Sequence, residues 1–492
     1  MEHLTKEHLL GQISNLTPEE SDLISRAYDF AKQAHATQQR KSGEPYFVHL
    51  YATAENLIRY QMDPVTIAAG LLHDTLEDTE TSEEKLEQEF GVEILTLVKG
   101  VTKLGHVKYR GRERNLESLR KFLMALAQDQ RVLMIKLADR LHNLKTLQHV
   151  RKDKQERIAL ESIEVYAPLA DRLGIGALKG ELEDAAFPYA YPKEYEKIEK
   201  LLAERVEPME QSLTAVYEKL RAELATNPIK IISIDHRIKH KYSLWKKLQK
   251  KGVTIDTVYD LVALRVIVET VEECYAVFGL IHSLWRPLPG RIKDYIALPK
   301  LNGYQSLHTT VFTGHGGIVE IQIRTEAMHR RAEYGIASHY AYKIDTAGAE
   351  SDPKFRWVKE FKNLGEEVEQ PDAFFKQLKA DMFNDRIFVF TPKGDVIDLP
   401  TGSTPIDFAY AVHTDIGNAA SGARINGKFV ALDTEIKSSD IVEIVTRKDS
   451  TPKSRWLDYA KTNSAKKHIR TYLNENKESG IISRFLPKQF RR

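Results

Sequence analysis

The sequence of 492 residues contains a single cysteine, Cys274, which excludes an internal disulfide framework and a cysteine-rich zinc site. One thiol fits a reducing compartment. No run of about 18 apolar residues occurs, so the sequence predicts no membrane span, and its charged N-terminal segment lacks the apolar stretch of a signal peptide. Neither sign of charge is in excess, because 72 Lys and Arg residues stand against 70 Asp and Glu residues. A site for an anion must therefore come from local clustering of cationic residues. Together with the single thiol and the lack of a signal peptide or membrane span, this leads us to expect a cytosolic protein.

The length favours about three domains. Residues 1–195 follow helical periodicity, and residues 196–343 change to mixed α/β patterns. A small, polar and acidic stretch opens residues 344–384, which are predicted to form a linker and a helix. Residues 385–447 have the strand, turn and helix signals of a compact third unit with a hairpin. Residues 448–492 form a basic, partly helical tail, and no internal repeat is present.

The strongest local signal is the hexapeptide HDTLED at residues 73–78. It follows apolar residues of a predicted helix. On that helix His73 and Glu77 would lie one turn apart, as would Asp74 and Asp78. So many ionisable groups beside an apolar face are costly unless a cation compensates them.

A second predicted helix, IKLADRLHNLKTL, carries Asp139 and Asn143 on one face beside a leucine stripe. His49 follows Tyr46 and Phe47 in an earlier segment that begins with Arg40 and Lys41. Two imidazoles and two carboxylates without thiolates suit an ion such as Mn²⁺. Such an ion would lower the pKa of a bound water and create a nucleophile near neutral pH. The predicted metal ligands are His49, His73, Asp74 and Asp139.

Glu77 and Asp78 are then expected to orient the water and shuttle protons, while Arg40 and Lys41 would hold a substrate phosphate. Taken singly, each histidine is more often a satisfied core residue, and each carboxylate belongs more often to a solvated helix face. The clustering of these residues on two helices favours the metal site.

A second polar group begins at Arg237, where cations accumulate over a stretch expected to be helical. The alternative, a solvated amphipathic helix, is equally compatible with this stretch alone. Asp260 directly precedes the β-branched strand at residues 262–269, a suitable place for an Mg²⁺ ligand. The phosphate-binding candidates of this stretch are Arg237, Lys239, Ser243 and Lys247.

The alternating strand at residues 318–325 would place Glu320, Gln322 and Arg324 on one face, as expected over a ligand; an ordinary half-exposed strand is the alternative. The preceding loop combines cations with a tyrosine that would stack on a purine and amides that would read its edge. Its candidate residues are Lys293, Lys300, Asn302, Tyr304, Gln305 and His308. Two carboxylates with many cations fit phosphoryl-type transfer.

Segments such as HDTLED, KLADRLHNLKTL, YDLVALRVIV, KDYIALPKLNGYQSLHTTV and FVFTPKGDVIDLPTGSTPIDFAYAVHT together resemble the long RelA/SpoT homologues, the stringent-response alarmone enzymes. The resemblance runs from about residue 20 to residue 470 and implies a multidomain fold. An all-α HD-type hydrolase domain would be followed by an α/β nucleotidyltransferase-like synthetase domain and a β-grasp TGS domain.

The resemblance implies a bifunctional enzyme. It would transfer pyrophosphate from ATP to the 3′-hydroxyl of GDP or GTP to make (p)ppGpp, and would hydrolyse (p)ppGpp to GDP or GTP and pyrophosphate. It implies Mn²⁺ in the hydrolase, and Mg²⁺ on Asp260 and Glu320 in the synthetase. Its implied catalytic residues are Glu77, Asp78, Asp260 and Glu320. The implied substrate contacts are Arg40, Lys41 and Asn143 in the hydrolase and Arg237, Lys239, Ser243, Lys247, Lys293, Lys300, Asn302, Tyr304, Gln305 and His308 in the synthetase. His413 matches a contact with uncharged tRNA.

Two departures from the family pattern stand out. Asp171 occupies a position where members usually have histidine, and the C-terminal Cys-rich and ACT regions have no counterpart, which leaves control by the ribosome open. Two alternatives also stay open. One is a tRNA- or ribosome-binding sensor with weak catalysis, which the basic tail favours. The other is a different HD-plus-nucleotidyltransferase enzyme that processes tRNA, against which the loop YQSLHTT counts.

Overall fold

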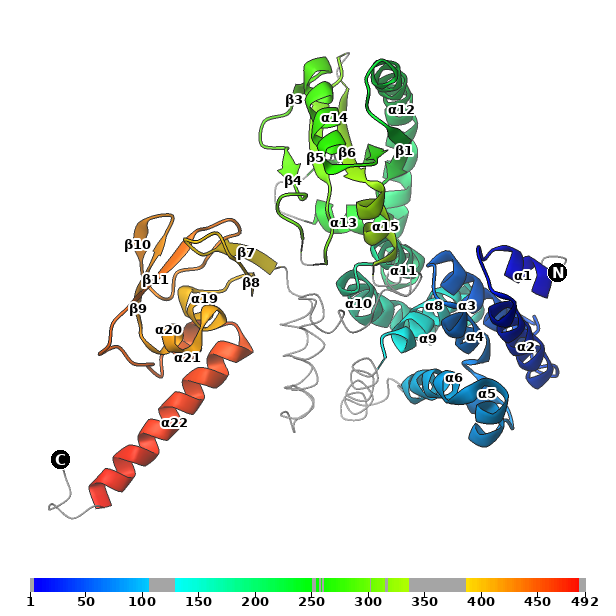
Figure 1. Cartoon of the computed structure of the whole chain (residues 1–492), viewed down its shortest axis with the longest axis horizontal. Coiled ribbons are helices and arrows are strands. Elements are labelled where there is room, and N and C mark those ends of the chain that lie inside the picture. Colours follow the sequence, from blue (N-terminus) through cyan, green and yellow to red (C-terminus); the bar gives the residue numbers. More distant parts are fainter. Residues whose placement is uncertain are drawn as a thin grey trace. The chain divides into compact units, whose positions relative to one another are not determined.

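The computed structural model describes residues 4–105, 129–249, 254–255, 258, 261–300, 302–314, 317–335 and 386–485. The chain divides into two compact units, Met1–Glu367 and Val368–Arg492 (Figure 1). The predicted linker at 344–384 lies outside the described residues, and the domain boundaries inferred from the sequence stay predictions.

The first part of the first unit is built from helices, as the periodicity predicts. They are α1 (Lys6–Gly11), α2 (Pro18–Ala34), α3 (Phe47–Arg59), α4 (Pro64–Leu72), α5 (Thr75–Asp78), α6 (Glu83–Gly105), α8 (Arg131–Lys145), the 3₁₀ turn η1 (Leu147–His149), α9 (Lys152–Glu161), the π-helical turn η2 (Ser162–Tyr166), α10 (Ala167–Arg172), α11 (Gly176–Ala190) and α12 (Pro192–Ala225).

Local chemistry sets where these helices begin. A capping box at Thr17 and Glu20 opens α2, and the side chain of Asp63 caps α4 by accepting a hydrogen bond from the Thr66 amide. Helix α4 is buried along most of its length, because α2, α3 and α6 pack around it. This burial fixes the end of α4, and with it the predicted metal ligands, in the centre of the helical part.

The expectation that HDTLED lies on one continuous helix is wrong. Helix α4 ends at Leu72, His73 caps its C-terminus, and Asp74 precedes the short α5. The hydroxyl of Thr75 donates to the Leu72 carbonyl at 2.6 Å, which satisfies a backbone acceptor that the interrupted helix leaves open. The break lets His73 and Asp74 turn inward together, while Glu77 and Asp78 stay exposed.

The second part of the first unit is a mixed sheet with helices, as predicted. Its elements are β1 (Ile231–Ile238), α13 (Lys241–Leu248), β2 (Val262–Val268), α14 (Val271–Leu284), β3 (Arg286–Pro287), β4 (Lys293–Asp294), β5 (Leu307–Phe312), β6 (Ile318–Thr325) and α15 (Glu326–Tyr334). The strand order is β1-β2-β6-β5-β3, with β4 paired to β5, and only β2 and β6 run parallel to each other.

One face of this sheet is apolar and covered by α14, which packs on β2, β5 and β6. Directly paired residues project to the same face of a sheet. The buried side chains of Leu264, Ile321 and Thr309 therefore share this face, because Ile321 pairs with both of the others. His282 of α14 lies 2.8 Å from the Thr309 hydroxyl, in agreement with this packing. The opposite face carries the polar residues.

The second unit has the predicted order of elements. They are β7 (Arg386–Phe390), β8 (Val396–Pro400), α19 (Pro405–Val412), α20 (Thr414–Asn418), β9 (Ala420–Ile425), β10 (Lys428–Val430), β11 (Val442–Thr446), α21 (Trp456–Tyr459) and α22 (Asn463–Phe485). The hairpin between β9 and β10 turns at Asn426 and Gly427, whose φ angles of 52° and 79° are typical of an Asn-Gly turn.

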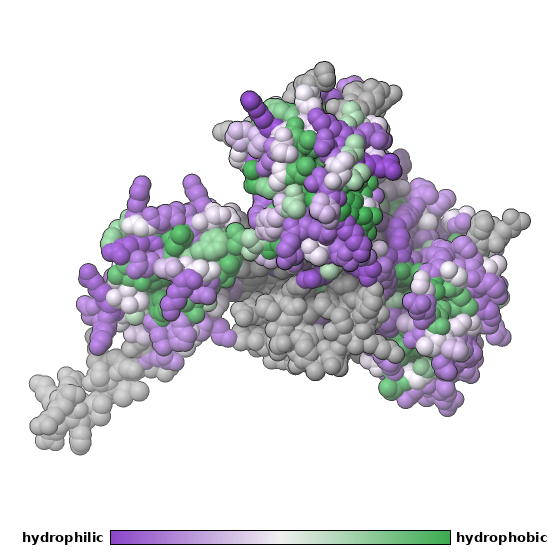
Figure 2. All heavy atoms as spheres, turned by 45° about the horizontal axis from the view of Figure 1, so that its top comes forward, coloured by the Kyte–Doolittle hydropathy of each residue, from purple (hydrophilic) through white to green (hydrophobic). Residues whose placement is uncertain are grey.

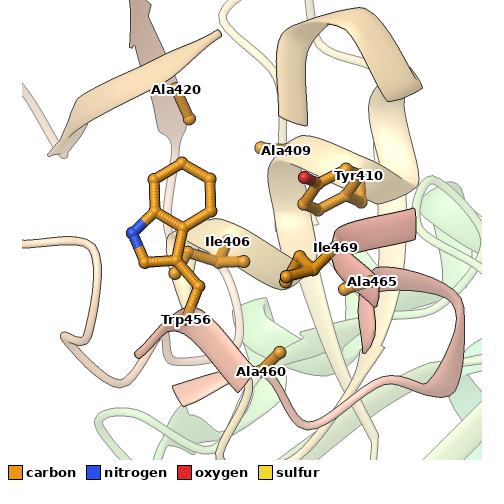
Figure 3. Close-up of a cluster of buried hydrophobic side chains, with 8 residues drawn as sticks. All are labelled: Ile406, Ala409, Tyr410, Ala420, Trp456, Ala460, Ala465 and Ile469. Atoms are coloured by element: carbon orange, nitrogen blue, oxygen red, sulfur yellow. The ribbon is translucent and has the colours of Figure 1, made fainter. Parts of the chain in front are cut away.

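Helices α19, α21 and α22 enclose one of the two apolar clusters described in the second unit. The side chains of Ile406, Tyr410, Trp456 and Ile469 face one another in Figure 3. The buried carboxylate of Asp407 holds the same elements together, because it accepts hydrogen bonds from backbone amides on α19's N-terminal side and at residues 461–462. The basic tail predicted from the sequence therefore packs on the rest of the second unit through the contact of α22 with α19.

On the face drawn in Figure 2, hydrophilic residues cover most of the coloured surface, and hydrophobic residues appear in small separate areas. Within the described ranges, no helix combines the length and apolar character that crossing a bilayer requires.

Two glycines fix how the helical part meets the sheet part inside the first unit. Gly174, in the turn between α10 and α11, has φ +76°, and a Cβ there would lie 3.0 Å from the Asn302 carbonyl oxygen. Gly335, after α15, has φ +53°, and a Cβ there would overlap the Leu173 carbonyl oxygen. Both positions need glycine, because another residue meets an unfavourable φ and a close backbone.

We expect Gly335→Ala to destabilise the first unit by about 1–3 kcal/mol, since a strained φ and a steric overlap coincide. Thermal and urea unfolding of the full chain measure the change. Gly290→Ala is the matched control, because Gly290 has φ +71° but a Cβ there would meet nothing within 4 Å. Equal losses in the two variants would contradict the close contact with Leu173.

Candidate functional site

A buried cluster of potential metal ligands lies where α3, α4 and α5 meet. The ligand atoms of His49, His73 and Asp74 all lie within 4.8 Å of one another. Asp74 Oδ2 is 3.1 Å from His73 Nε2 and 3.6 Å from His49 Nε2. Three of the four ligands predicted from the sequence are thus brought together by three consecutive helices.

The two ring nitrogens of His73 have different environments. Nδ1 donates to the Gly70 carbonyl at 2.7 Å, which leaves Nε2 directed at the cluster. Among the described residues this buried Nε2 has no partner with acceptable hydrogen-bond geometry, although Asp74 lies close to it. A backbone carbonyl on the outer nitrogen is the usual second partner of a metal-binding histidine. The donor set therefore fits a divalent cation.

Asp139 of α8 reaches the same cluster from another side. Its Oδ1 lies 3.2 Å from His49 Nε2, and its Oδ2 accepts from Lys136 at 2.8 Å. The amide of Asn143 also donates to Oδ1. Lys136 was not anticipated from the sequence, although its position three residues before Asp139 on a helix is the spacing that brings side chains together.

Electrostatics keep these carboxylates ionised. Burial opposes the charge of Asp74, but the imidazoles of His73 and His49 outweigh it and hold the pKa of Asp74 well below its usual range. Burial likewise opposes the charge of Asp139, but Lys136 and the two imidazoles outweigh burial and hold the pKa of Asp139 well below its usual range. Burial lowers the pKa of His73, yet the neighbouring Asp74 raises it to about 9.

Beside the cluster lies a cavity of about 440 Å³, a size typical of sites for small ligands. It is bounded by the segment 39–42 and by α8, η1 and α9. Its cationic lining comes from Arg40, Lys41, Lys136 and Arg140, and Asp139 connects it to the metal-ligand cluster. Such a cavity is suited to a small anionic molecule held against a metal ion.

The predicted substrate contacts of this site lie in the cavity wall. Arg40 donates to Asn143 Oδ1 at 2.6 Å and lies 2.9 Å from His142 Nδ1, and Lys41 is exposed at the rim. His142 also lies 2.8 Å from His49 Nδ1. Burial, with the charges of His49 and Arg40, lowers the pKa of His142 to about 3, so this ring is neutral.

Several residues of this site escaped the sequence reasoning. The Tyr46 hydroxyl lies 2.9 Å from Asp74 Oδ2 and 2.8 Å from Asp78 Oδ2, so the two carboxylates share its single hydrogen. Arg140 is held by Glu161 at 3.3 Å and lies over the Tyr166 ring at 4.3 Å. The i, i+4 spacing of Lys136 and Arg140 on α8 was the available signal. Glu77 is exposed on α5 beside this site.

The second site occupies the polar face of the sheet. Cross-strand register sets five polar residues in one row: Asp235, Arg265, Gln322, His308 and Lys293. The neighbouring row on the same face contains Arg237, Ala263, Glu320 and Thr310. Strand pairing therefore gathers predicted residues from four segments of the chain onto one surface.

One expectation for this face is wrong. Arg237 lies on strand β1 and not on a helix, since α13 begins only at Lys241. Arg324 is 1% exposed, because it meets Glu333 of α15 at 2.9 Å and His329 at 2.6 Å, and its guanidinium lies 6.0 Å from the centre of the Tyr304 ring. Alternation gave the correct face of the strand but could not show that α15 covers its end.

A network joins the loop before β5 to Glu320. The Tyr304 hydroxyl lies 2.8 Å from His308 Nε2, and His308 Nδ1 lies 3.3 Å from Glu320 Oε1. Gln322 donates to the same carboxylate at 2.9 Å. The Lys300 ammonium lies over the Tyr304 ring at 5.0 Å. These contacts orient Glu320 toward the cations of the polar face.

Asp260, the second predicted metal ligand of this site, lies outside the described residues. Ser243 of α13 donates to Glu183 of α11 at 3.3 Å, and Gln305 donates to the Ile296 carbonyl at 3.3 Å. Lys239 follows β1, Lys247 lies on α13, and Lys293 begins β4. Neither Arg265 nor Glu183 was anticipated from the sequence.

His413, the candidate tRNA contact, lies between α19 and α20 in the second unit. Its side chain is 64% exposed, and its Nδ1 accepts a hydrogen bond from the Asp415 amide at 3.2 Å. The ring is accessible to a partner.

Comparison with known families agrees with this arrangement. The HD domain family model matches residues 27–176, the region found in RelA / SpoT proteins matches residues 236–347, and the TGS domain matches residues 387–446. These matches fall on the helical part, the sheet part and the second unit, respectively.

Curated relatives are similar along nearly the whole chain. The guanosine-3′,5′-bis(diphosphate) 3′-pyrophosphohydrolase of Aquifex aeolicus is 46% identical over 467 residues, covering 95% of this chain and 66% of that protein. A GTP pyrophosphokinase of Streptomyces coelicolor is 45% identical, covering 93% and 56%. The bifunctional (p)ppGpp synthase/hydrolase RelA of Mycobacterium tuberculosis is 44% identical, covering 93% and 63%. The chain thus spans less than two thirds of the length of these relatives.

The fold and its sites define a protein in which an HD domain with a potential metal centre precedes an α/β synthetase-type domain and a β-grasp TGS domain. The chain belongs to the RelA/SpoT family. The resemblance inferred from the sequence is confirmed, together with the fold class.

Removing His73 should abolish high-affinity binding of a divalent ion. We expect His73→Ala to lose affinity for Mn²⁺ by roughly a hundredfold or more, because loss of a hydrogen-bond partner of a ligand alone typically costs roughly 10–100-fold. Isothermal calorimetry on metal-free protein measures this, with the exposed His413→Ala as control. Unchanged Mn²⁺ binding by His73→Ala would show that the cluster is not the metal site.

Glu183 predicts a pH-dependent stability. Burial raises the pKa of its carboxyl from 4.5 to about 7. When the pKa of a carboxyl is higher in the folded protein than in the unfolded chain, the folded protein is most stable below the unfolded-state pKa. That stability is lost as pH rises through the folded-state pKa. At about pH 8, Glu183→Gln should therefore raise the free energy of unfolding by up to about 3 kcal/mol, and the thermal midpoint should rise with it. At about pH 5 both quantities should change little. Differential scanning calorimetry tests this, and an equal gain at both pH values would contradict it.

Proposed function

We propose that the chain is a bifunctional alarmone enzyme of the stringent response. It transfers pyrophosphate from ATP to the 3′-hydroxyl of GDP or GTP, releasing AMP, and it hydrolyses (p)ppGpp to GDP or GTP and pyrophosphate. The observation that carries the proposal is the presence of two different candidate sites in one unit. A buried His–Asp cluster adjoins a cation-lined cavity, and a separate sheet face gathers cations around Glu320. Names of the relatives include both activities.

For hydrolysis, His49, His73, Asp74 and Asp139 would hold the ion. The mixed imidazole and carboxylate donors favour Mn²⁺, which supplies Lewis acidity that generates a nucleophile from water near neutral pH. Arg40, Lys41 and Asn143 bind the phosphates of (p)ppGpp in the cavity. Asp78 is held by Tyr46 close to Asp74, where it and Glu77 accept and return the proton of the attacking water.

For synthesis, the carboxylates of Asp260 and Glu320 would hold Mg²⁺, the hard cation suited to oxygen ligands and phosphates. Glu320 also accepts the proton of the attacking 3′-hydroxyl. The ATP phosphates bind to the cations around β1 and α13, and Tyr304 stacks on guanine while Asn302 and Gln305 read its edge. Charge neutralisation then favours transfer. The ATP-side residues are Arg237, Lys239, Ser243 and Lys247, with Lys293, Lys300 and His308 completing the phosphate contacts.

The TGS domain is proposed to contact uncharged tRNA through His413, whose exposed ring supports this role. Association with the ribosome and a cytoplasmic location stay predictions from the sequence and the family. A sensor with weak catalysis is the alternative for which the tRNA contact would be the principal function.

The two activities should be separable by single substitutions. His73→Ala should lose hydrolysis while keeping synthesis, and Glu320→Gln should do the reverse, each by roughly a thousandfold because a catalytic group or ion is removed. Labelled ATP and GDP with Mg²⁺ report synthesis, and separately supplied labelled ppGpp with Mn²⁺ reports hydrolysis. Glu326→Gln, an identical change on α15 at a residue that pairs with Arg330, is the matched control.

Three results would contradict the proposal. Hydrolysis that survives His73→Ala excludes the His–Asp cluster as its site. Binding of uncharged tRNA without any guanosine-nucleotide turnover favours the sensor. Transfer to a polynucleotide instead of GDP indicates a tRNA-processing enzyme.

A further inference from the structure

The corner between α10 and α11 lies against the synthetase-type domain. We define the acceptor loop as residues 302–304, which contain Asn302 and Tyr304. Gly174, in the corner, approaches the Asn302 backbone, and a Cβ on Gly176 would lie 3.3 Å from the Ala332 carbonyl oxygen. The turn between α10 and α11 thus lies close to the backbone of both the acceptor loop and α15, so these helices pack tightly against the synthetase-type domain.

Asp171, at the end of α10, adds a polar contact between these helices and the acceptor loop. Its Oδ1 accepts from the Asn302 amide nitrogen at 3.3 Å, and its Oδ2 accepts from Lys179 of α11 at 3.1 Å. Lys179 therefore holds the carboxylate while its other oxygen faces the loop. The carboxylate comes from the helices that follow the HD cluster, and the loop belongs to the other domain.

The orientation of Asn302 depends on this contact. Its amide nitrogen donates to Asp171, and its amide oxygen accepts from the Tyr304 backbone nitrogen at 3.2 Å. With both ends of the amide engaged, the side chain has one orientation and the loop one conformation. Tyr304 continues through His308 to Glu320, so the contact leads by hydrogen bonds to the candidate catalytic carboxylate.

We propose that Asp171 is a positioning residue for the guanine nucleotide that accepts pyrophosphate, and that the acceptor site is therefore completed by the HD-side helices. This inference rests on the proposed synthetase function. Asp171 acts through Asn302 and Tyr304 and does not touch the reacting atoms. The ATP side is held differently, because Asp184 accepts from the Tyr242 amide at 3.0 Å and contacts His240 at the start of α13. Loss of Asp171 should consequently affect the acceptor and spare ATP.

Steady-state synthesis by the full chain tests this with ATP and GDP varied separately. We expect Asp171→Ala to raise KM for GDP by roughly three- to tenfold, as for one partly exposed hydrogen bond to a charged group, with kcat and KM for ATP within about twofold. Asp171→Asn keeps an oxygen acceptor and should restore KM for GDP. In an Asn302→Ala background, Asp171→Ala should have no further effect.

Glu181→Ala is the matched control, because this α11 carboxylate bonds Arg59 and Tyr60 of the HD domain and not the acceptor loop. Its KM for GDP should stay at the wild-type value. Hydrolysis in the same preparations reports whether the fold is intact, and Asp171→Ala should retain it.

Equal increases in both KM values, no change in either, or failure of Asp171→Asn to restore KM for GDP would overturn the role of Asp171. If the wild type forms no product, the proposed synthesis itself is wrong. Calorimetric binding of GDP alone then still decides the inference: weaker binding by Asp171→Ala than by wild type supports it, and equal or undetectable binding in both overturns it.

Discussion

Compensation of one buried and one partly buried carboxylate is the constraint on which the helical part depends. Asp74 and Asp139 are ionised inside a helical core, where an isolated charge is strongly disfavoured. Their surroundings supply the balance, with two imidazoles, Lys136 and the hydroxyl of Tyr46 directed at them. The packing of α3, α4 and α8 brings these groups together, and the break after Leu72 lets two of them turn inward. The same arrangement explains why the cluster suits a divalent cation.

In the sheet part, the constraint is that one face must pack against a helix while the other must present polar side chains. Period-two alternation buries one face under α14 and leaves the other for cations and Glu320. Since register aligns residues across five strands in one polar row and four in the other, a change in one strand pairing would disperse both rows. Helix α15 covers one end of this face, which turns Arg324 into part of a buried ion network with Glu333.

Helices α10 and α11 connect the surroundings of the two candidate sites. They follow α9 and η2, whose residues line the cavity wall and hold Arg140, and they then contact α13, α15 and the acceptor loop. Glu183 lies buried in this contact beside Ser243, and Asp171 bonds Asn302. A shift of these helices would therefore change the surroundings of both sites. The close backbone contacts at Gly174 and Gly335 hold the helices in place against such a shift.

The sequence by itself determined the helical and mixed α/β character of the two parts, the order of elements in the third domain and the residue types of both sites, because periodicity, turn residues and clustered motifs are local properties. It could not determine the break at His73, the strand position of Arg237 or the burial of Arg324, which depend on packing between distant segments. Tertiary structure alone decided that Asp139 lies beside His49 and that Asp171 meets Asn302. Those contacts join residues far apart along the chain, and only folding sets the distances between them.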